Sequence, residues 1–289
     1  MHRLPSPRAE RDVPTRPTSG AVAIIPARLQ STRLPEKPLQ DLGGKPLVVR
    51  VLERARSARS LEAIWVATDS ERIAAAVRGA GGETILTRGD HPSGLDRVAE
   101  AATALCDVTR RASQADGVRD PDLAADPVIL NVQGDEPFLN PEGLDHLVSL
   151  FDRPEVRMAT LAAPFAPDDD PNDPNRVKVV LDRMGRALYF SRSPIPHGGS
   201  APGASRTGAA GPAPTLLHVG IYGYRLTTLR ELAALPPAPL ETSERLEQLR
   251  ALWNGIPIHV AIGDYHSIGI DTPEDLARAR TRWSEGGAS

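Results

Sequence analysis

The chain has 289 residues, of which 40% are hydrophobic and 25% charged, the composition of a globular protein with a sizeable core. Its 34 basic and 37 acidic side chains give a formal net charge of −3, so no global positive field is available to bind nucleic acid, although a local basic site is compatible with this balance. A single cysteine excludes an intrachain disulfide, and no apolar run approaches the about 18 residues of a membrane span, so we expect a cytoplasmic protein without membrane insertion.

The first twenty residues predict a disordered arm. They contain four Arg and four Pro and lack the apolar segment of a secretory signal peptide. From Ala21 onward, short apolar runs alternate with helical patterns, which is typical of a sheet covered by helices on both faces. We therefore expect a single α/β domain over residues 21–285.

The apolar periodicity predicts the following elements in chain order. Strands are expected at residues 21–26, 63–68, around 85 and at 128–132, with helices at 46–57 and 72–80 between them. Further strands are expected at residues 158–163, 177–181, 187–190 and 219–224, followed by helices at 243–253 and 273–283. The last helix has a clear beginning, with Thr272 as N-cap, Pro273 in the first turn and Asp275 at the capping-box position.

Two segments fit no core element. Residues 107–127 are polar and without periodicity, and residues 198–214 contain only Gly, Ala, Pro, Ser, Thr and one Arg. Such segments bury too little apolar surface to offset their ordering entropy, so we expect two mobile surface loops.

Polar residues follow the predicted strands at the points where these end. Arg28 follows the first strand, Asp69 the second, and Gln133 and Asp135 the fourth. In open α/β sheets, ligands bind outside the carboxyl ends of the strands. We therefore expect the functional site at that edge of the sheet.

The loop after the first strand is the strongest chemical signal. Its sequence RLQSTRLPEKP, residues 28–38, places Arg28, Arg33 and Lys37 within ten residues of one another. Arg binds phosphate oxygens bidentately and Lys supplies a compact charge, so the cluster suits a polyphosphate. The loop lacks the GxxxxGK[ST] pattern of a Walker A loop, and a merely solvated basic loop is the alternative interpretation.

Acidic residues supply a second signal. Asp135 lies at a strand end in NVQGDEP, residues 131–137, where a carboxylate could hold Mg²⁺ or could simply form a turn. Asp271 lies just before the capped helix at residues 273–283, a position that is unremarkable by itself.

Seven motifs occur in a fixed order along the chain. They are IPARLQSTRLPEKPL at residues 25–39, NVQGDEP at 131–137, NDPNRVKVV at 172–180, ALYFSR at 187–192, GIYGYR at 220–225, LEQLRALW at 246–253 and GIDTPEDL at 269–276. With these motifs the chain resembles the 3-deoxy-manno-octulosonate cytidylyltransferase family over about residues 21–282.

The resemblance implies a nucleotide-diphospho-sugar transferase fold, which is Rossmann-like, with a mostly parallel mixed sheet flanked by helices and a smaller sugar-binding and dimerisation subregion. It also implies a homodimer that joins CTP to 3-deoxy-D-manno-octulosonate (Kdo) for lipopolysaccharide biosynthesis, using Mg²⁺ and releasing pyrophosphate. Alternatives are a cytidylyltransferase for 8-amino-Kdo, sialic acid or pseudaminic acid, and a catalytically weak nucleotide-binding regulator.

The resemblance also assigns site residues. Triphosphate binding falls on Arg28, Arg33 and Lys37, and Mg²⁺ binding falls on Asp135 and Asp271; of these, Arg28, Lys37, Asp135 and Asp271 are the candidate catalytic residues. Contacts to base and ribose fall on Pro26, Ala27, Ser93 and Gln133. The sugar acid is assigned to Arg192, His218, Tyr222, Glu247 and Gln248, for which core packing or solvated helix positions are the structural alternatives.

Two positions depart from the family pattern. Glu36 stands where the family has Gly, which places a negative charge beside Lys37 and predicts weaker binding of the triphosphate. Leu95 stands where the family has Thr, which removes a hydroxyl that could contact ligand or cap the following helix.

Overall fold

The computed structural model describes residues 21–115, 126–166, 169–197, 215–265 and 268–286. The predicted arm over residues 1–20, the predicted loop over residues 198–214, and residues 116–125 of the other predicted loop lie outside these ranges.

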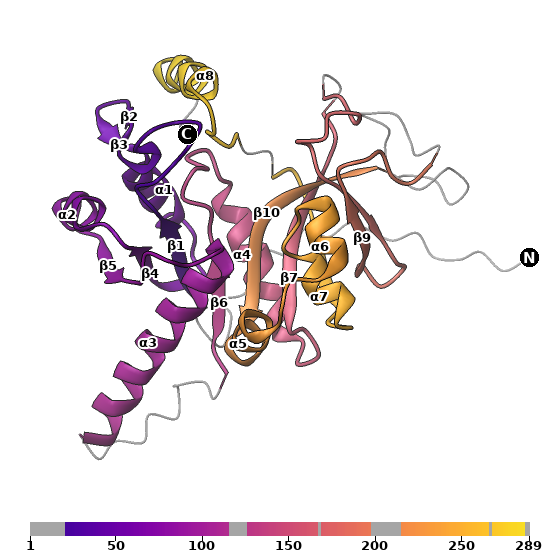
Figure 1. The fold of residues 1–289 in the computed structure, drawn as a ribbon, viewed down its shortest axis with the longest axis horizontal. Helices are drawn as coiled ribbons and strands as arrows, with labels where there is room; N and C mark the ends of the chain where they lie inside the picture. Colours follow the sequence, from indigo (N-terminus) through magenta and orange to yellow (C-terminus); the bar gives the residue numbers. More distant parts are fainter. Residues whose placement is uncertain (1–20, 116–125, 167–168, 198–214, 266–267, 287–289) are drawn as a thin grey trace, which may run out of the picture.

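A mixed nine-stranded sheet forms the centre of the molecule (Figure 1). Its main path runs β11–β7–β10–β6–β1–β4–β5, and β8 and β9 extend it beside β10. The strands are β1 (Ala21–Ala27), β4 (Leu61–Thr68), β5 (Glu83–Leu86), β6 (Val128–Asn131), β7 (Met158–Pro164), β8 (Lys178–Leu181), β9 (Ala187–Ser191), β10 (Leu216–Arg225) and β11 (Ile258–Ile262). A separate hairpin joins β2 (Asp41–Leu42) to β3 (Lys45–Pro46).

Strand direction divides the sheet into two parts. β1 pairs in parallel with β4 and β6, and β4 pairs in parallel with β5. β10 runs antiparallel to β6, β7 and β8, while β7 and β11 are parallel. The predicted α/β class with a mixed sheet flanked by helices is confirmed. The strands β6, β1, β4 and β5 form the part of the sheet in which all neighbours are parallel.

Helices cover both faces of the sheet. One face packs against α1 (Leu47–Ala55), α2 (Glu71–Gly79) and α4 (Pro141–Ser149), and the other packs against α3 (Gly94–Ala115), α5 (Leu226–Ala234), α6 (Pro239–Glu244) and α7 (Leu249–Trp253). Val48, Val51, Leu52 and Ala55 of α1 are fully buried, because helical spacing puts them on the one side that faces the sheet. None of the helices within the described ranges is long and apolar enough to cross a membrane.

The order of the strands reverses at β1. The chain passes from β1 to β4 and β5 on one side and then crosses over, through α3, to β6 on the other side of β1. Such a switch point leaves a crevice at the carboxyl ends of the two diverging strands. The loops that follow β1 and β6 therefore meet in this structure where a ligand can bind.

A third apolar cluster holds α8 (Pro273–Ser284) near this switch point. It consists of buried residues from the loop after β1, the β2–β3 hairpin, α1, the loop after β6, the segment before α8, and α8 itself, namely Leu34, Leu42, Leu47, Phe138, Ile270, Leu276 and Ala279. Trp283 lies against the same cluster, with its ring centroid 5.9 Å from that of Phe138 and 4.4 Å from the guanidinium carbon of Arg50. The C-terminal helix is thus packed against the first loops of the chain (Figure 1).

Two predicted elements differ from the structure. The predicted helix over residues 243–253 is wrong, because Arg245 has a φ of 54° and divides it into α6 and α7. A residue in the left-handed region ends an α-helix. Glu241 supports the break, since its carboxylate accepts a hydrogen bond from the backbone N–H of Ala238 at 2.9 Å and pairs with Arg250 at 2.6 Å.

The predicted loop over residues 107–127 is also wrong in its first part, because α3 continues to Ala115. Once a helix is nucleated, each further residue adds one hydrogen bond, so a helix can continue through a polar run that shows no apolar periodicity. The elements predicted from the sequence also lack the whole of α3 and the shorter α4, α5, β11 and β2–β3 hairpin.

The close approach of the β6 loop to β1 generates a test. A Cβ atom on Gly134 would lie 2.8 Å from the backbone oxygen of Pro26, whereas a Cβ on Gly94 would meet nothing nearer than 3.9 Å. Gly134→Ala should therefore lower the free energy of unfolding by about 1–3 kcal/mol, the usual cost of overpacking. Gly94→Ala is the matched control, and thermal and urea unfolding of the two variants measures the difference. Equal stability of the two variants would contradict the close approach.

Candidate active site

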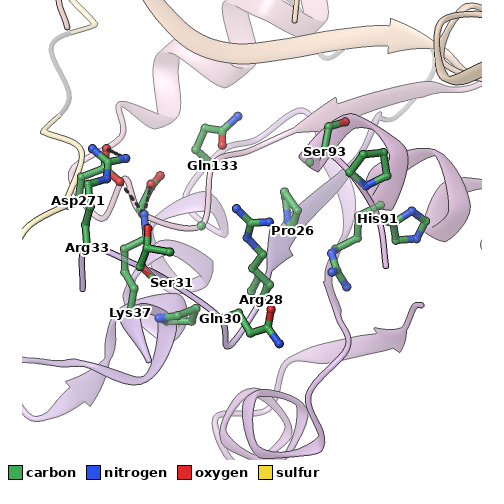
Figure 2. A pocket seen from close by; sticks show the side chains of 18 of the residues that line it. Pro26, Arg28, Gln30, Ser31, Arg33, Lys37, His91, Ser93, Gln133 and Asp271 are labelled. Carbon is green, nitrogen blue, oxygen red and sulfur yellow. Dashed lines mark hydrogen bonds and ion pairs between the residues drawn. The ribbon is translucent and has the colours of Figure 1, made fainter. Parts of the chain in front are cut away.

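A cavity of about 640 Å³ opens where β1 and β6 end (Figure 2). Its lining includes every residue that the resemblance assigns to the nucleotide and to the metal: Pro26, Ala27, Arg28, Arg33, Lys37, Ser93, Gln133, Asp135 and Asp271. Figure 2 shows Arg33, Lys37 and Asp271 at one end of the cavity and Pro26, Ser93 and His91 at the other. The structure thus brings these predicted residues together, while their individual roles stay predictions.

Lys37 connects two carboxylates from distant parts of the chain. Its Nζ lies 2.5 Å from Oδ2 of Asp135 and 2.9 Å from Oδ1 of Asp271. Arg33 completes the cluster, with Nη2 at 3.1 Å from Oδ2 of Asp271. The backbone joins the same segments, because the N–H of Ile270 donates to the carbonyl of Asp135 at 3.0 Å.

The charge on Lys37 is stable in this setting. Burial disfavours the ammonium, but attraction and hydrogen bonding to Asp135 and Asp271 outweigh burial and raise the pKa of Lys37. Lys37 is therefore positively charged at neutral pH. The cluster of Arg33, Lys37, Asp135 and Asp271 holds two positive and two negative charges.

The two aspartates fit a divalent cation only in part. Among the described residues, no group of three or more His, Cys, Asp and Glu side chains is placed to hold a metal ion. Asp135 and Asp271 nevertheless direct one carboxylate oxygen each at the same cation, the ammonium of Lys37. Mg²⁺ takes one or two carboxylates and completes its shell with phosphate oxygens and water, so this donor set suits Mg²⁺ that is bound together with a nucleotide.

Arg28 is placed differently from the other two loop cations. It lines the cavity between its two ends (Figure 2). Its guanidinium makes no hydrogen bond or ion pair with any residue that the structure describes. Five donors are thus available to an anion in the cavity.

The opposite end of the cavity is formed by the turn before α3. Ser93 caps the helix, because its hydroxyl accepts a hydrogen bond from the N–H of Asp96 at 3.3 Å and donates to the Asp96 carboxylate at 2.7 Å. His91 is bonded to Glu100 of the same helix. These contacts fix the turn to the first turns of α3.

Arg97 lines the cavity but was missed from the sequence. Its side chain is buried and donates to Oγ1 of Thr87 at 2.6 Å and to Oδ2 of Asp69 at 3.2 Å. These bonds tie α3 to the ends of β4 and β5. The available signal was Asp69 itself, a carboxylate at a strand end that needs a cationic partner when it is partly buried.

Of the residues assigned to the sugar acid, Glu247 lines the cavity and Gln248 lies beside it in the chain. Both belong to the turn between α6 and α7, so the expected helix at these positions is wrong. Gln248 is buried, which excludes the solvated alternative for it, whereas Glu247 is exposed, as that alternative expects. Desolvation of its carboxyl group, which lines the cavity, raises the pKa of Glu247, although Arg250 and the N–H of Leu95 act in the opposite direction. The Nε2 of Gln248 is buried and has no hydrogen-bond partner within the described part of the chain.

The other three sugar-acid residues lie outside the lining of the cavity. The ring of His218 packs between those of Phe190 and Tyr222, at centroid distances of 4.9 and 5.4 Å, and burial lowers the pKa of His218 to about 3. Arg192 donates to the backbone carbonyls of Glu244 at 2.7 Å and Pro174 at 2.9 Å. A role of these residues toward a substrate stays a prediction.

Comparisons with known proteins decide the family. The family model described as Cytidylyltransferase matches residues 22–258. The 3-deoxy-manno-octulosonate cytidylyltransferase of Syntrophobacter fumaroxidans (strain DSM 10017 / MPOB) is 49% identical over 257 residues, which cover 88% of this chain and 93% of that protein. The chain belongs to the 3-deoxy-manno-octulosonate cytidylyltransferase family.

Solved structures agree with this assignment. A CMP:2-keto-3-deoxy-manno-octonic acid synthetase in complex with CTP is 37% identical, with a TM-score of 0.75 over 93% of this chain and 100% of that chain. A cytidylyltransferase from Leptospira borgpetersenii is 15% identical, with a TM-score of 0.54 over 92% of this chain and 87% of that chain, which shows a shared fold. The expected fold and family are both confirmed.

The structure gives a different account of Glu36 from the one expected. Glu36 does not line the cavity, and its carboxylate binds both terminal nitrogens of Arg72 in α2, one of them at 3.0 Å. The hydrogen bond from Arg72 lowers the pKa of Glu36. Glu36 also has a φ of 50°, the backbone region that glycine favours. This charge is therefore paired with Arg72 and is not directed into the cavity.

Leu95 likewise does not weaken the site in the way expected. Its side chain is 4% exposed and packs in the same apolar cluster as Ile24 and Val98. Because Ser93 caps α3, the hydroxyl that a Thr would have supplied at position 95 is not needed for the cap.

Two substitutions of Glu36 separate the effect of its backbone conformation on stability from the effect of its contact with Arg72. Glu36→Ala keeps a side chain in the left-handed region and loses the contact to Arg72, so it should lower the melting temperature. Glu36→Gly loses the same contact but relieves the backbone, so it should be more stable than Glu36→Ala. CTP affinity of Glu36→Gly, measured by calorimetry at low ionic strength, should stay within about twofold of the parent. Clearly tighter binding would mean that the carboxylate does oppose the triphosphate.

Proposed function

We propose that the protein transfers CMP from CTP to Kdo, forming CMP-Kdo and pyrophosphate for lipopolysaccharide biosynthesis. The observation that carries this proposal is the cation cluster of Arg28, Arg33 and Lys37 facing Asp135 and Asp271 in one cavity of a family member. A relative that is 49% identical is named for this activity, and a similar solved structure holds CTP.

The reaction needs no covalent enzyme intermediate. The anomeric hydroxyl oxygen of Kdo attacks the α-phosphorus of CTP, a new P–O bond forms, the bond to the pyrophosphate leaving group breaks, and the hydroxyl proton is released to solvent water. Arg28, Arg33 and Lys37 bind the triphosphate and stabilise the negative charge on the departing pyrophosphate. Asp135 and Asp271 would hold Mg²⁺, which when bound neutralises phosphate charge and lowers the pKa of a hydroxyl that it touches.

The cavity has room for base and sugar on different walls. The backbone of Pro26 and Ala27, Ser93 and Gln133 would contact the base and ribose, since all four line the cavity and Figure 2 shows Pro26 and Ser93 away from the end that holds Asp271. Glu247 and Gln248 would accept and donate hydrogen bonds to the sugar hydroxyls. Arg192, His218 and Tyr222 would complete the sugar pocket, with Arg192 supplying positive charge near the carboxylate.

We further propose a cytoplasmic homodimer. Three large apolar side chains are more than half exposed on the β8–β9 hairpin and on α7, which packs against β9: Met184, Leu188 and Trp253. Exposed apolar side chains gathered on one part of a surface are typical of an association surface. A cytoplasmic location agrees with a nucleotide substrate and with a chain that has one cysteine.

Substrate profiling tests the proposed activity. Pyrophosphate release should be fast with CTP, Mg²⁺ and Kdo, and far slower when ATP or GTP replaces CTP or when sialic or pseudaminic acid replaces Kdo. 8-Amino-Kdo belongs in the same panel, because it differs from Kdo at one substituent. Equal turnover of another sugar acid would overturn the assignment of Kdo, and absence of turnover with every acid would support the nucleotide-binding regulator.

The roles of the aspartates are tested by isosteric substitution. Asp135→Asn and Asp271→Asn should each lower kcat by roughly 10²–10³-fold, the usual cost of a contact made mainly in the transition state. Asp145→Asn is the control, because Asp145 lies outside the cavity and accepts backbone N–H bonds from Arg59 and Ser60, both at 2.8 Å. That control should change the melting temperature and leave kcat near the parent value. A near-parental kcat for Asp271→Asn would exclude a metal role for this residue.

A further inference from the structure

We propose that Lys37 has a second role besides binding phosphate: its ammonium occupies the metal site in the nucleotide-free protein, so a divalent cation enters only together with the triphosphate. The inference rests on the proposed function in taking the anion to be a nucleoside triphosphate. It concerns the order in which ligands bind, which the overall reaction does not specify.

The geometry gives Lys37 the position that a shared metal ion would need. Its Nζ lies within hydrogen-bond distance of Asp135 Oδ2 and Asp271 Oδ1 at the same time. An ammonium and a divalent cation cannot both contact these two oxygens, because like charges at such short separation repel strongly. Binding of a free divalent cation to these two oxygens therefore requires that Lys37 leave them.

The surroundings favour the ammonium while no nucleotide is present. The side chains of Lys37 and Asp135 are 18% and 26% exposed, so solvent screens their attraction only in part. With Arg33 on Asp271, the cluster is balanced at two positive and two negative charges. Removal of Lys37 without a replacement leaves a partly buried carboxylate unpaired, which is costly.

A triphosphate changes this balance. It brings several negative charges into a cavity where Arg28 has no partner among the described residues and Lys37 lies within the same lining. The backbone of Lys37 is held in the helical turn Lys37–Leu39, whose Pro38 is buried. Lys37 can therefore follow the phosphates only by rotating its long side chain. The two aspartates then lose their resident cation at the moment when metal-bound nucleotide arrives.

The test measures metal binding in the absence of nucleotide and sugar. Mn²⁺ is the probe, because its free and bound forms are distinguished by electron paramagnetic resonance. The parent protein should bind Mn²⁺ weakly, and Lys37→Met should bind it at least about tenfold more tightly. Arg28→Met is the matched control, since it removes a cation from the same cavity that does not contact the aspartates, and its Mn²⁺ affinity should stay within about threefold of the parent.

Two further variants keep the result interpretable. Lys37→Gln should reproduce the gain of Lys37→Met, and circular dichroism and melting temperature establish that both fold. In Lys37→Met/Asp135→Asn the gain should disappear, because one of the two ligands is neutral. Unchanged Mn²⁺ affinity in both Lys37 variants, or an equal gain in Arg28→Met, overturns the proposal. Since no turnover is measured, this outcome is independent of the pyrophosphate assay that tests the function.

Discussion

One ammonium group joins the parts of this site that are farthest apart in the chain. Lys37 follows the first strand, Asp135 follows β6 and Asp271 precedes the last helix, yet both carboxylates contact the same nitrogen. The contact requires that three loops end at one place. The rest of the architecture can be understood from what brings these three loops together, since the two carboxylates would repel each other without the ammonium between them.

The requirement is met by backbone topology and by apolar packing together. The switch point at β1 brings the loops after β1 and β6 to the same edge of the sheet. Asp271 has no such strand to position it, and it depends instead on Ile270, which is fully buried in the third apolar cluster and whose N–H is bonded to Asp135. The capping box of Thr272 and Asp275 then fixes the start of α8 directly after it. Packing in the third apolar cluster thus helps to set the distance between the two carboxylates.

Local patterns in the sequence predicted β1, β4, β5, β6, α1 and α2, because buried parallel strands and amphipathic helices have distinct periods, whereas α3 and α4 were not predicted. The break at Arg245 was not predictable in this way, since it depends on the Glu241–Arg250 pair and not on any Gly or Pro in the turn. The site residues on strand ends could be grouped from the sequence, but their pairing could not. Glu36 is an example. Its negative charge was expected to act on Lys37 because the two residues are neighbours in the sequence, but the left-handed backbone at Glu36 directs its side chain toward Arg72. The position of Arg97 in the cavity and the contact of Lys37 with both aspartates likewise depend on residues that are distant in the sequence.

The central claim is that Lys37, Asp135 and Asp271 form one site in which the lysine and a metal ion exchange. A crystal structure of the protein with CTP and Mn²⁺, with the metal located by its anomalous signal, tests this most directly. The account predicts Mn²⁺ bound to Asp135 and Asp271, with the Nζ of Lys37 moved onto a phosphate oxygen. Lys37 still bridging the two aspartates while Mn²⁺ is bound elsewhere on the nucleotide would contradict it.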